Sequence, residues 1–262
     1  MSKPRLIPKT KLTTTNLTRH YQLNSKQIHI LKMTYKFRFI TAPLLAQYKG
    51  WTNTRSSLRR LENLYVQGYL GKYLNKNELF QNKGTRYYLT PKALIYLRDN
   101  FRFNESILHA MYKNKSVGEA FIDHSIAIIR VYLSLRSSNP DVFKSFTANE
   151  LGGYDFFPTP KPDLYLLRKK SSKAKTNEYL VYIFNDVQLF IIRKQFTKLL
   201  EHFDSGDWEA ETGNPYPAIL YILKDSSAEK RIRNYINTKL DWAGIDDLKV
   251  LTTNMKELLV II

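Results

Sequence analysis

The 262-residue sequence contains no cysteine. This absence excludes disulfide frameworks, thiolate nucleophiles and zinc sites built on cysteine. The five histidines, at positions 20, 29, 109, 124 and 202, show no ligand spacing, so no metal site is expected from them. No apolar run approaches the roughly 20 residues that span a bilayer, and the basic N-terminus lacks the apolar segment of a signal peptide. We therefore expect a soluble, cytoplasmic protein with no membrane partner.

Acidic residues are scarce in the first part of the chain. Residues 1–115 hold 22 Lys and Arg but only four acids, a net charge of 22 − 4 = +18, whereas residues 116–262 hold 19 of each sign and are neutral. A lysine content that was merely high throughout would give an excess in both parts. A strongly basic region favours a polyanionic partner, usually a nucleic acid. The asymmetry predicts two domains, of which only the first is suited to nucleic acid.

The hydrophobic content of 43% is that of a folded protein, and the chain is long enough for two small domains. We expect a basic flexible arm over residues 1–24, a first domain over 25–115 and a second domain over 116–262. The arm has five cations and no acid. Either it lies along phosphates when nucleic acid binds, or it is simply an unstructured tail.

Capping residues and apolar spacing divide the first domain into short elements. Asn24 or Ser25 begins a helix that runs to about residue 33, and Thr41 begins a second helix that stops at Gly50. A strand-like run over 37–40 lies between them. The other expected elements are a helix over 53–67, strands over 69–73 and 86–89, and a helix over 91–99.

The helix over 53–67 is the most informative element. Leu58, Leu61 and Tyr65 recur at helical spacing and predict its buried stripe. The residues expected on the opposite side are polar: Thr52, Ser56, Arg59, Arg60, Asn63 and Gln67. In the major groove of DNA, arginine can bond guanine O6 and N7, and asparagine or glutamine can bond adenine N6 and N7.

The order helix, strand, helix, helix and two-stranded ribbon is that of a winged helix-turn-helix. Its recognition helix would be 53–67 and its wing tip 74–84. Such domains also serve as protein-interaction modules, but the charge of this one favours DNA. The residues expected to contact double-stranded DNA are Thr52, Asn53, Arg55, Ser56, Arg59, Arg60, Asn63, Lys72, Lys76, Lys83 and Arg86.

The second domain begins with a helical pattern over 118–137. The expected elements after it are strands over 142–147, 163–168, 179–184 and 218–223, helices over 189–203 and 228–242, and a last strand over 249–252. This order predicts a mixed sheet flanked by helices, as in the restriction-endonuclease-like, PD-(D/E)xK-type fold. The fold class is therefore α+β, a winged helix followed by a nuclease-like domain.

The chemistry of that nuclease fold requires an Asp at the start of the second strand and an acid-x-Lys on the third. Two carboxylates hold Mg²⁺ and the lysine orients water. Asp163 stands at the first place. On the third strand, either Phe184 occupies the acid position and a metal ligand is lost, or Asp186 is the acid and Gln188 replaces the lysine. Since neither register is complete, Asp163, Asp186 and Gln188 are vestigial candidates, and we expect no catalytic residue and no bound metal.

Two other groups of titratable residues were considered as sites. Asp123 and His124 lie beside apolar residues on the 118–137 helix, where a histidine is more often a hydrogen-bonded core or interface residue than a base. The acids at 204, 207, 209 and 211 surround Trp208 but lack EF-hand spacing, so a solvated acidic loop is favoured over a cation site. The sequence has no P-loop, Rossmann fingerprint or G-x-S-x-G motif.

Six segments follow one another within residues 25–205: LRRLENLYVQGYL (58–70), RYYLTPKAL (86–94), DHSIAIIRVYLSL (123–135), KPDLYLL (161–167), VYIFND (181–186) and a basic helix from about residue 193. Together they resemble the replication-relaxation family of plasmid and integrative-element proteins. The resemblance implies a DNA-binding domain and a nuclease-like domain acting on mobile DNA. The family pattern has a Glu two positions before an Asp on the third strand; Asp163 and Asp186 match it, while Phe184 replaces the Glu.

The sequence therefore predicts a DNA-binding protein of a plasmid or other mobile element, acting in replication, relaxation or transfer, with an inactive nuclease-like domain and no cofactor. One alternative is an active Mg²⁺-dependent endonuclease that uses Asp163, Asp186 and Gln188. Another is a replication or transcription regulator that acts mainly through protein partners. Symmetric dimers are common among such proteins, so a second copy of the chain and replication or transfer proteins are further candidate partners.

Overall fold

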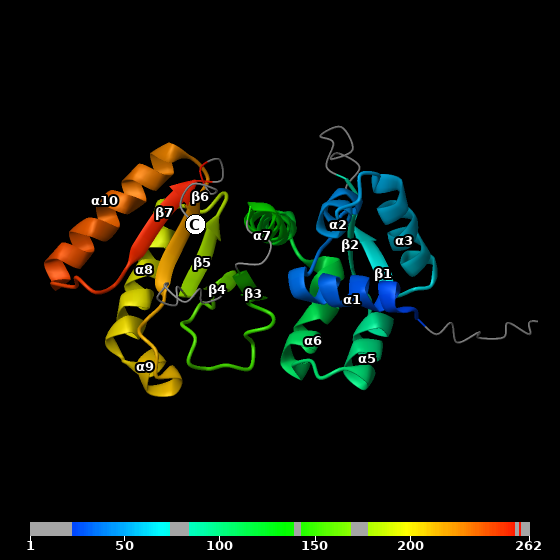
Figure 1. Cartoon of the computed structure of the whole chain (residues 1–262), viewed down its shortest axis with the longest axis horizontal. Coiled ribbons are helices and arrows are strands. Elements are labelled where there is room, and N and C mark those ends of the chain that lie inside the picture. Colours follow the sequence, from blue (N-terminus) through cyan, green and yellow to red (C-terminus); the bar gives the residue numbers. More distant parts are fainter. Residues whose placement is uncertain (1–22, 74–83, 139–142, 169–177, 255–256, 258–262) are drawn as a thin grey trace, which may run out of the picture.

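A computed structural model describes residues 23–73, 84–138, 143–168, 178–254 and 257. The fold is α+β: helices accompany one two-stranded sheet and one mixed five-stranded sheet (Figure 1). Most of the predicted arm, and the predicted wing tip with Lys76 and Lys83, lie outside the described residues. Within the part that the structure describes, no helix has both the length and the apolar character needed to cross a bilayer.

The N-terminal part of the structure consists of helices around the small sheet. Its elements are α1 (Ser25–Phe37), α2 (Ala42–Lys49), α3 (Thr54–Val66), β1 (Leu70–Tyr73), β2 (Arg86–Leu89), α5 (Pro91–Asn100), α6 (Glu105–Met111) and the 3-10 helix η1 (Tyr112–Ser116). β1 and β2 pair antiparallel. The sequence did not predict α6 or η1, whereas α2, α3, β1, β2 and α5 lie close to where it placed them.

Side-chain caps determine where the first two helices begin, as predicted. The Asn24 side chain accepts a hydrogen bond from the Gln27 backbone N–H at 3.0 Å, and the Gln27 side chain accepts one from the Asn24 N–H. Thr41 caps α2 in the same way, and α2 ends at Gly50 with a φ of 67°. These signals are local, so they could be read from neighbouring residues alone.

α1 is longer than predicted, and the expected strand over 37–40 is reduced to a single bridge between Ile40 and Tyr87. Phe37 belongs to the helix because its side chain is buried in the N-terminal core. The helix stops at Arg38, which has a φ of 68°. The Arg38 guanidinium donates to the side-chain oxygen of Asn114 at 2.6 Å and 3.0 Å, which stabilises this unusual backbone conformation.

The buried face of α3 differs from the predicted one. Ser57, Leu61 and Leu64 are buried, whereas Leu58 and Tyr65 are 44% and 42% exposed. Only Leu61 of the predicted stripe is therefore correct. The two sets lie on neighbouring faces of one helix, and α2 and β1, which pack on α3, cover the face that carries Leu64. The polar side chains of α3 consequently face a slightly different direction from the expected one.

The C-terminal part is a mixed sheet with helices on both faces. Its elements are α7 (Glu119–Ser138), β3 (Phe143–Thr147), β4 (Leu164–Arg168), β5 (Glu178–Phe184), α8 (Leu189–Asp204), α9 (Asp207–Thr212), β6 (Ala218–Leu223), α10 (Ser226–Ala243) and β7 (Val250–Asn254). The strand order is β3-β4-β5-β6-β7, with β3, β4 and β5 paired antiparallel and β5, β6 and β7 paired parallel. This confirms the predicted mixed sheet.

The predicted acidic loop around Trp208 is instead the short helix α9. Its acids are exposed, as expected, but Trp208 is buried and makes T-shaped ring contacts with Phe156 and Phe157. Burial of this large aromatic side chain stabilises the helical turn. This helix could not be recognised from apolar spacing, because Trp208 is its one buried side chain.

Both sides of α7 are buried, against different partners. Ile122, Ile129 and Leu133 join the core of the N-terminal part, together with side chains of α1 and α2. Val131 and Leu135, on the other side, join a core formed with β4, β5 and β6. α7 accordingly lies between the two parts in Figure 1. The predicted boundary between residues 115 and 116 therefore precedes a helix that both parts share.

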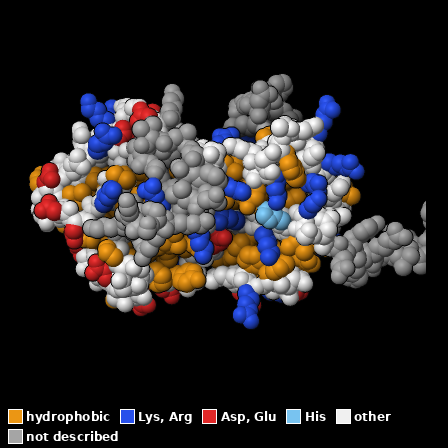
Figure 2. All heavy atoms as spheres, in the orientation of Figure 1, with side chains coloured by type: hydrophobic (Ala, Val, Ile, Leu, Met, Phe, Trp, Pro, Cys, Tyr) orange, Lys and Arg blue, Asp and Glu red, His pale blue; other side chains and the backbone are white. Residues whose placement is uncertain are grey.

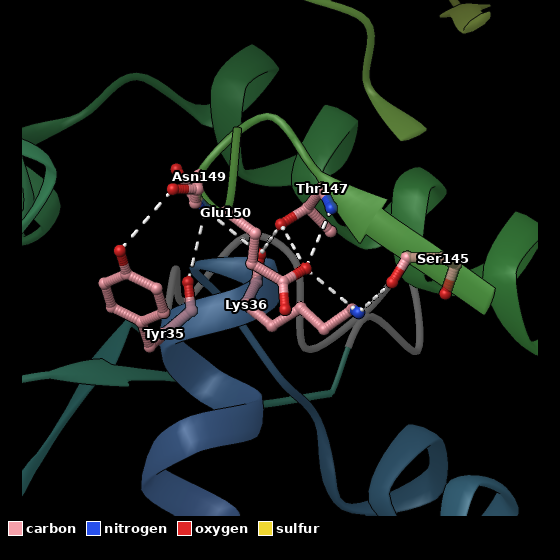
Figure 3. Close-up of polar contacts among 6 residues, drawn as sticks. All are labelled: Tyr35, Lys36, Ser145, Thr147, Asn149 and Glu150. Atoms are coloured by element: carbon pink, nitrogen blue, oxygen red, sulfur yellow. Dashed lines mark hydrogen bonds and ion pairs between the residues drawn. The ribbon is translucent and has the colours of Figure 1, made fainter. Parts of the chain in front are cut away.

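A second connection joins the end of α1 to β3 and the turn that follows it (Figure 3). The Thr147 hydroxyl donates to the Lys36 carbonyl at 2.9 Å, and the Asn149 amide donates to the Tyr35 and Lys36 carbonyls at 3.2 Å and 3.0 Å. The Lys36 ammonium lies 2.9 Å from the Glu150 carboxylate. Carbonyls in the last turn of a helix have no partner within the helix, and here the C-terminal part supplies one.

The shared helix leads to a prediction about cooperativity. Replacing Ile129 by Ala should lower the free energy of unfolding by about 2–5 kcal/mol, because it leaves a cavity in the core. Since both parts pack on α7, the indole NMR signals of Trp51 and Trp208 should disappear at the same urea concentration, and should shift together in the variant. The exposed neighbour Arg130, changed to Ala, is the control. Separate midpoints for the two indoles would contradict a shared core.

Candidate nucleic-acid interface

The exposed side of α3 carries polar and cationic side chains, and the helix contains one acid. Arg55, Ser56, Arg59 and Asn63 are exposed, and Arg60 is half-buried. Ser56, Arg59, Arg60 and Asn63 line a shallow hollow of about 320 Å³. The structure thus brings together the centre of the predicted DNA-contacting set on one face. Two arginine guanidiniums and one asparagine amide are therefore among the groups that line the hollow.

The turn before α3 positions this face. The Asn53 side chain accepts a hydrogen bond from the Arg55 N–H at 2.8 Å, so Asn53 acts as the helix cap rather than as a free group. Thr52 is exposed in the same turn. The Arg60 guanidinium stacks over the Trp51 ring at 5.1 Å, which holds it at the edge of the polar face.

Gln67, predicted on the polar face, points elsewhere. It accepts a hydrogen bond from the Gln27 side chain at 3.0 Å and so connects the end of α3 to α1. Its carbonyl also accepts from Lys92 at 2.8 Å. Gln67 therefore stabilises the packing of these helices and is not presented with Arg59 and Asn63.

Lys72 and Arg86 are both engaged within the protein. The Lys72 ammonium lies 2.7 Å from the Glu62 carboxylate and 4.0 Å from the centre of the Tyr65 ring. Arg86 is buried and pairs with Asp123 of α7 at 3.2 Å. Arg86 therefore cannot be reached by a phosphate in this structure, and the charge of Lys72 is largely neutralised.

Glu62 was not singled out from the sequence, although it is the one acid of α3. Burial opposes ionisation of Glu62, but hydrogen bonds from Lys72 and Tyr87 and the positive charge of Lys72 outweigh it and lower the pKa of the carboxyl. Glu62 of α3 is therefore a charged partner of Lys72 in β1 and accepts a hydrogen bond from Tyr87 in β2. In the sequence, ten residues separate it from Lys72, so only the fold reveals the pair.

Figure 2 shows how the charges are distributed over one face of the molecule. Most of the visible acidic side chains lie over the C-terminal part, on the left, whereas the N-terminal part displays mainly Lys and Arg among its charged groups. This matches the division of charge in the sequence. Lys76 and Lys83 lie outside the described residues and cannot be placed on this surface.

The second group of predicted site residues lies in the C-terminal part, and the structure separates its members. One Asp163 oxygen lies 2.8 Å from His124 Nε2, and the other accepts the Ile183 backbone N–H at 2.7 Å. Asp186 is exposed beyond the end of β5 and contacts Lys224 at 2.5 Å. Gln188 forms the start of α8. Asp163 and Asp186 thus contact different partners, Asp163 toward α7 and Asp186 toward the end of β6.

A metal centre at these residues has no support in their geometry. No group of three His, Asp or Glu side chains that could hold a metal ion occurs among the described residues. Asp186 and Gln188 line a hollow of about 240 Å³ at the ends of β5 and β6, but Asp163 does not line it. In this arrangement the Asp163 carboxylate serves to dock α7 on the sheet.

His124 is a hydrogen-bonded residue between two elements, which is the role that the sequence favoured over that of a base. Burial opposes its protonation, but the hydrogen bond and charge of Asp163 outweigh this and raise the pKa of the imidazole above its usual value. His202 shows the opposite balance, because burial lowers its pKa more than its hydrogen bond to Phe156 raises it.

The His124–Asp163 pair leads to a pH prediction. Because the folded pKa of His124 is raised, the pair contributes stability that is present below the unfolded pKa of about 6.5 and is lost as pH rises through the folded value. In Asp163→Asn, the NMR titration of His124 should move to lower pH, since burial remains and the charge is removed. His202 should titrate as before and is the control. An unchanged His124 titration would contradict the pair.

No protein-family model matches the chain, and the search of curated proteins finds no match to it either. The resemblance to the replication-relaxation family therefore stays a prediction that depends on the six quoted segments. Of these, the structure places VYIFND at the end of β5 and KPDLYLL at the start of β4, beside each other in the sheet. The function must be argued from the surfaces themselves.

Proposed function

We propose that this chain is a DNA-binding protein whose N-terminal part is a winged helix-turn-helix. The observation that carries the proposal is the exposed face of α3, where Arg55, Arg59 and Asn63 project from a helix whose one acid, Glu62, is already paired. α2 and α3 are joined by the short turn 50–53, and the antiparallel β1–β2 ribbon follows α3. This is the arrangement in which a helix enters the major groove while a ribbon lies along the backbone.

Under this proposal, α3 reads base edges and the other exposed cations contact phosphates. Sequence preference would come from Arg59 and Asn63, whose side chains can bond guanine and adenine respectively. Most of the affinity would come from phosphate contacts and would fall steeply with salt. Double-stranded DNA of a plasmid or other mobile element is the proposed partner, with replication, relaxation or transfer as the process.

The C-terminal part would then be a nuclease-like sheet that no longer cuts. Asp163 uses both oxygens within the protein, Phe184 is buried at the end of β5 where the family pattern has an acid, and Asp186 faces Lys224. We propose that this part supports dimerisation, partner recruitment or further DNA contact.

The first test is a double substitution on α3. Arg59→Ala with Arg60→Ala should weaken binding to duplex DNA by about tenfold or more, because one bidentate arginine contact is worth about 1–3 kcal/mol. The matched control is Lys230→Ala with Arg231→Ala, which removes the same charge from exposed positions on α10. Fluorescence anisotropy at several salt concentrations measures both. If the two double variants lose affinity equally, α3 is not the recognition helix.

The second test separates binding from cleavage. Supercoiled, linear and single-stranded DNA should remain intact after incubation with the protein and Mg²⁺ or Mn²⁺, once the products are deproteinised and separated on a gel. Asp163→Asn should bind DNA like the unchanged protein. Nicked or linear product that disappears in Asp163→Asn would instead establish the metal-dependent endonuclease. Weak binding that salt does not alter would favour a regulator that acts through protein partners.

A further inference from the structure

A second hollow lies beside the polar face of α3, on the side toward α1 and α2. It has a volume of about 430 Å³ and is lined by Lys26, Ile30, Lys49, Trp51, Ser56 and Arg60. Four of these residues, Lys26, Ile30, Lys49 and Trp51, are not in the set predicted to contact DNA. They come from the first half of α1, the last turn of α2 and the turn before α3, so only the fold brings them together.

The hollow is positively charged, and no carboxylate lines it among the described residues. In the sequence, Glu62 is the first acid, so no acid precedes it in α1, α2 or the first turns of α3. Burial lowers the pKa of Lys49, and repulsion from Arg136, Arg60 and Lys26 lowers it further. Lys26, Lys49 and Arg60 thus line one hollow with no carboxylate among its described lining residues, and an anion bound between them would relieve their mutual repulsion.

The walls of the hollow are suited to a phosphate with a group attached. The first turn of α3 contributes Ser56 to the lining and contains no acid, and the first turn of a helix favours an anion. The Ser56 hydroxyl belongs to the same turn. Trp51 is half-buried, and Arg60 holds one side of it at 5.1 Å. A flat indole beside cations can pack against the sugar or base that carries a phosphate.

The hollow also adjoins the proposed DNA-reading face. Ser56 and Arg60 line both hollows, and Arg59 and Asn63 line the one on the polar side of α3. A phosphate in the second hollow would therefore lie next to the bases that Arg59 and Asn63 could reach. In a duplex, backbone phosphates likewise lie beside the base edges.

We propose that the hollow formed by Lys26, Lys49, Trp51, Ser56 and Arg60 is a binding site for a phosphate group that carries a nucleoside, and that a backbone phosphate of duplex DNA is its occupant. The choice of DNA as the source of the phosphate rests on the proposed function. The assignment of the hollow as an anion site does not rest on that function, because a free nucleotide or inorganic phosphate offers the same anion. Its role would be to fix the register of α3 in the groove.

The experiment follows the indole N–H signal of Trp51 in NMR spectra of the full chain. The sequence has three tryptophans, and Trp51→Phe identifies the signal of interest. Inorganic phosphate, adenosine 5′-monophosphate and a short DNA duplex are titrated separately. We expect the Trp51 signal to shift saturably with the duplex, and more weakly with the two small probes. The exposed Trp242 should not shift.

A charge-matched pair of variants gives the quantitative test. Lys49→Gln should weaken duplex binding several-fold and make the log–log salt dependence shallower by about 0.9, the value for one phosphate contact. Lys230→Gln removes the same charge from an exposed position on α10 and should change neither. Lys49→Gln should fold normally, since it relieves repulsion, and thermal unfolding checks this.

The outcomes distinguish the site from the function. If the duplex binds but Trp51 does not shift and Lys49→Gln equals Lys230→Gln, this site is wrong while DNA binding stands. If the duplex does not bind but adenosine monophosphate or phosphate shifts Trp51, and Lys49→Gln abolishes the shift, the anion site stands and DNA binding is wrong. If no probe shifts Trp51 and no duplex binds, both are overturned.

Discussion

The burial of α7 on both sides is the constraint on which the arrangement of the rest depends. A surface helix normally has one apolar face, but α7 has two, one formed around Ile129 and the other around Val131. Moving either part away from α7 would expose one of them to water, at about 1.5–3 kcal/mol for each large aliphatic side chain. The contacts of Lys36 and Tyr35 with the β3 turn add hydrogen bonds to the same junction. The polar face of α3 is therefore held at a defined position relative to the sheet.

Ion pairs within the fold engage some of the cations of the N-terminal part. Asp123 of α7 pairs with Arg86, and Glu62 pairs with Lys72, so two cations near the small sheet are neutralised within the fold. Lys36 at the end of α1 pairs with Glu150, but no carboxylate among the described residues lines the hollow of Lys26, Lys49 and Arg60. A basic sequence thus becomes a localised basic surface because the few acids are used at specific places.

Asp163 was a candidate metal ligand, but its contacts in the structure are those of a residue that holds elements together. In the nuclease-like arrangement it would be a metal ligand, but here one oxygen faces His124 and the other accepts the Ile183 N–H. The Asp163 carboxylate thereby connects α7 to the sheet. The second proposed ligand, Asp186, is exposed and faces Lys224.

The sequence by itself determined the longer helices and the paired strands, the caps at Asn24 and Thr41, the division of charge and the α+β class, because these are read from the residues and their local spacing. It missed the short helices α6, η1 and α9. It placed Arg59 and Asn63 correctly on an exposed face but misjudged Leu58 and Tyr65, since the buried side of α3 depends on what packs against it. Only the tertiary structure decided that Arg86 is buried, that Lys72 is paired, and that Asp163 meets His124 across 39 positions of sequence. Those pairings are long-range, and no local pattern of residues encodes which distant partner a charge will meet.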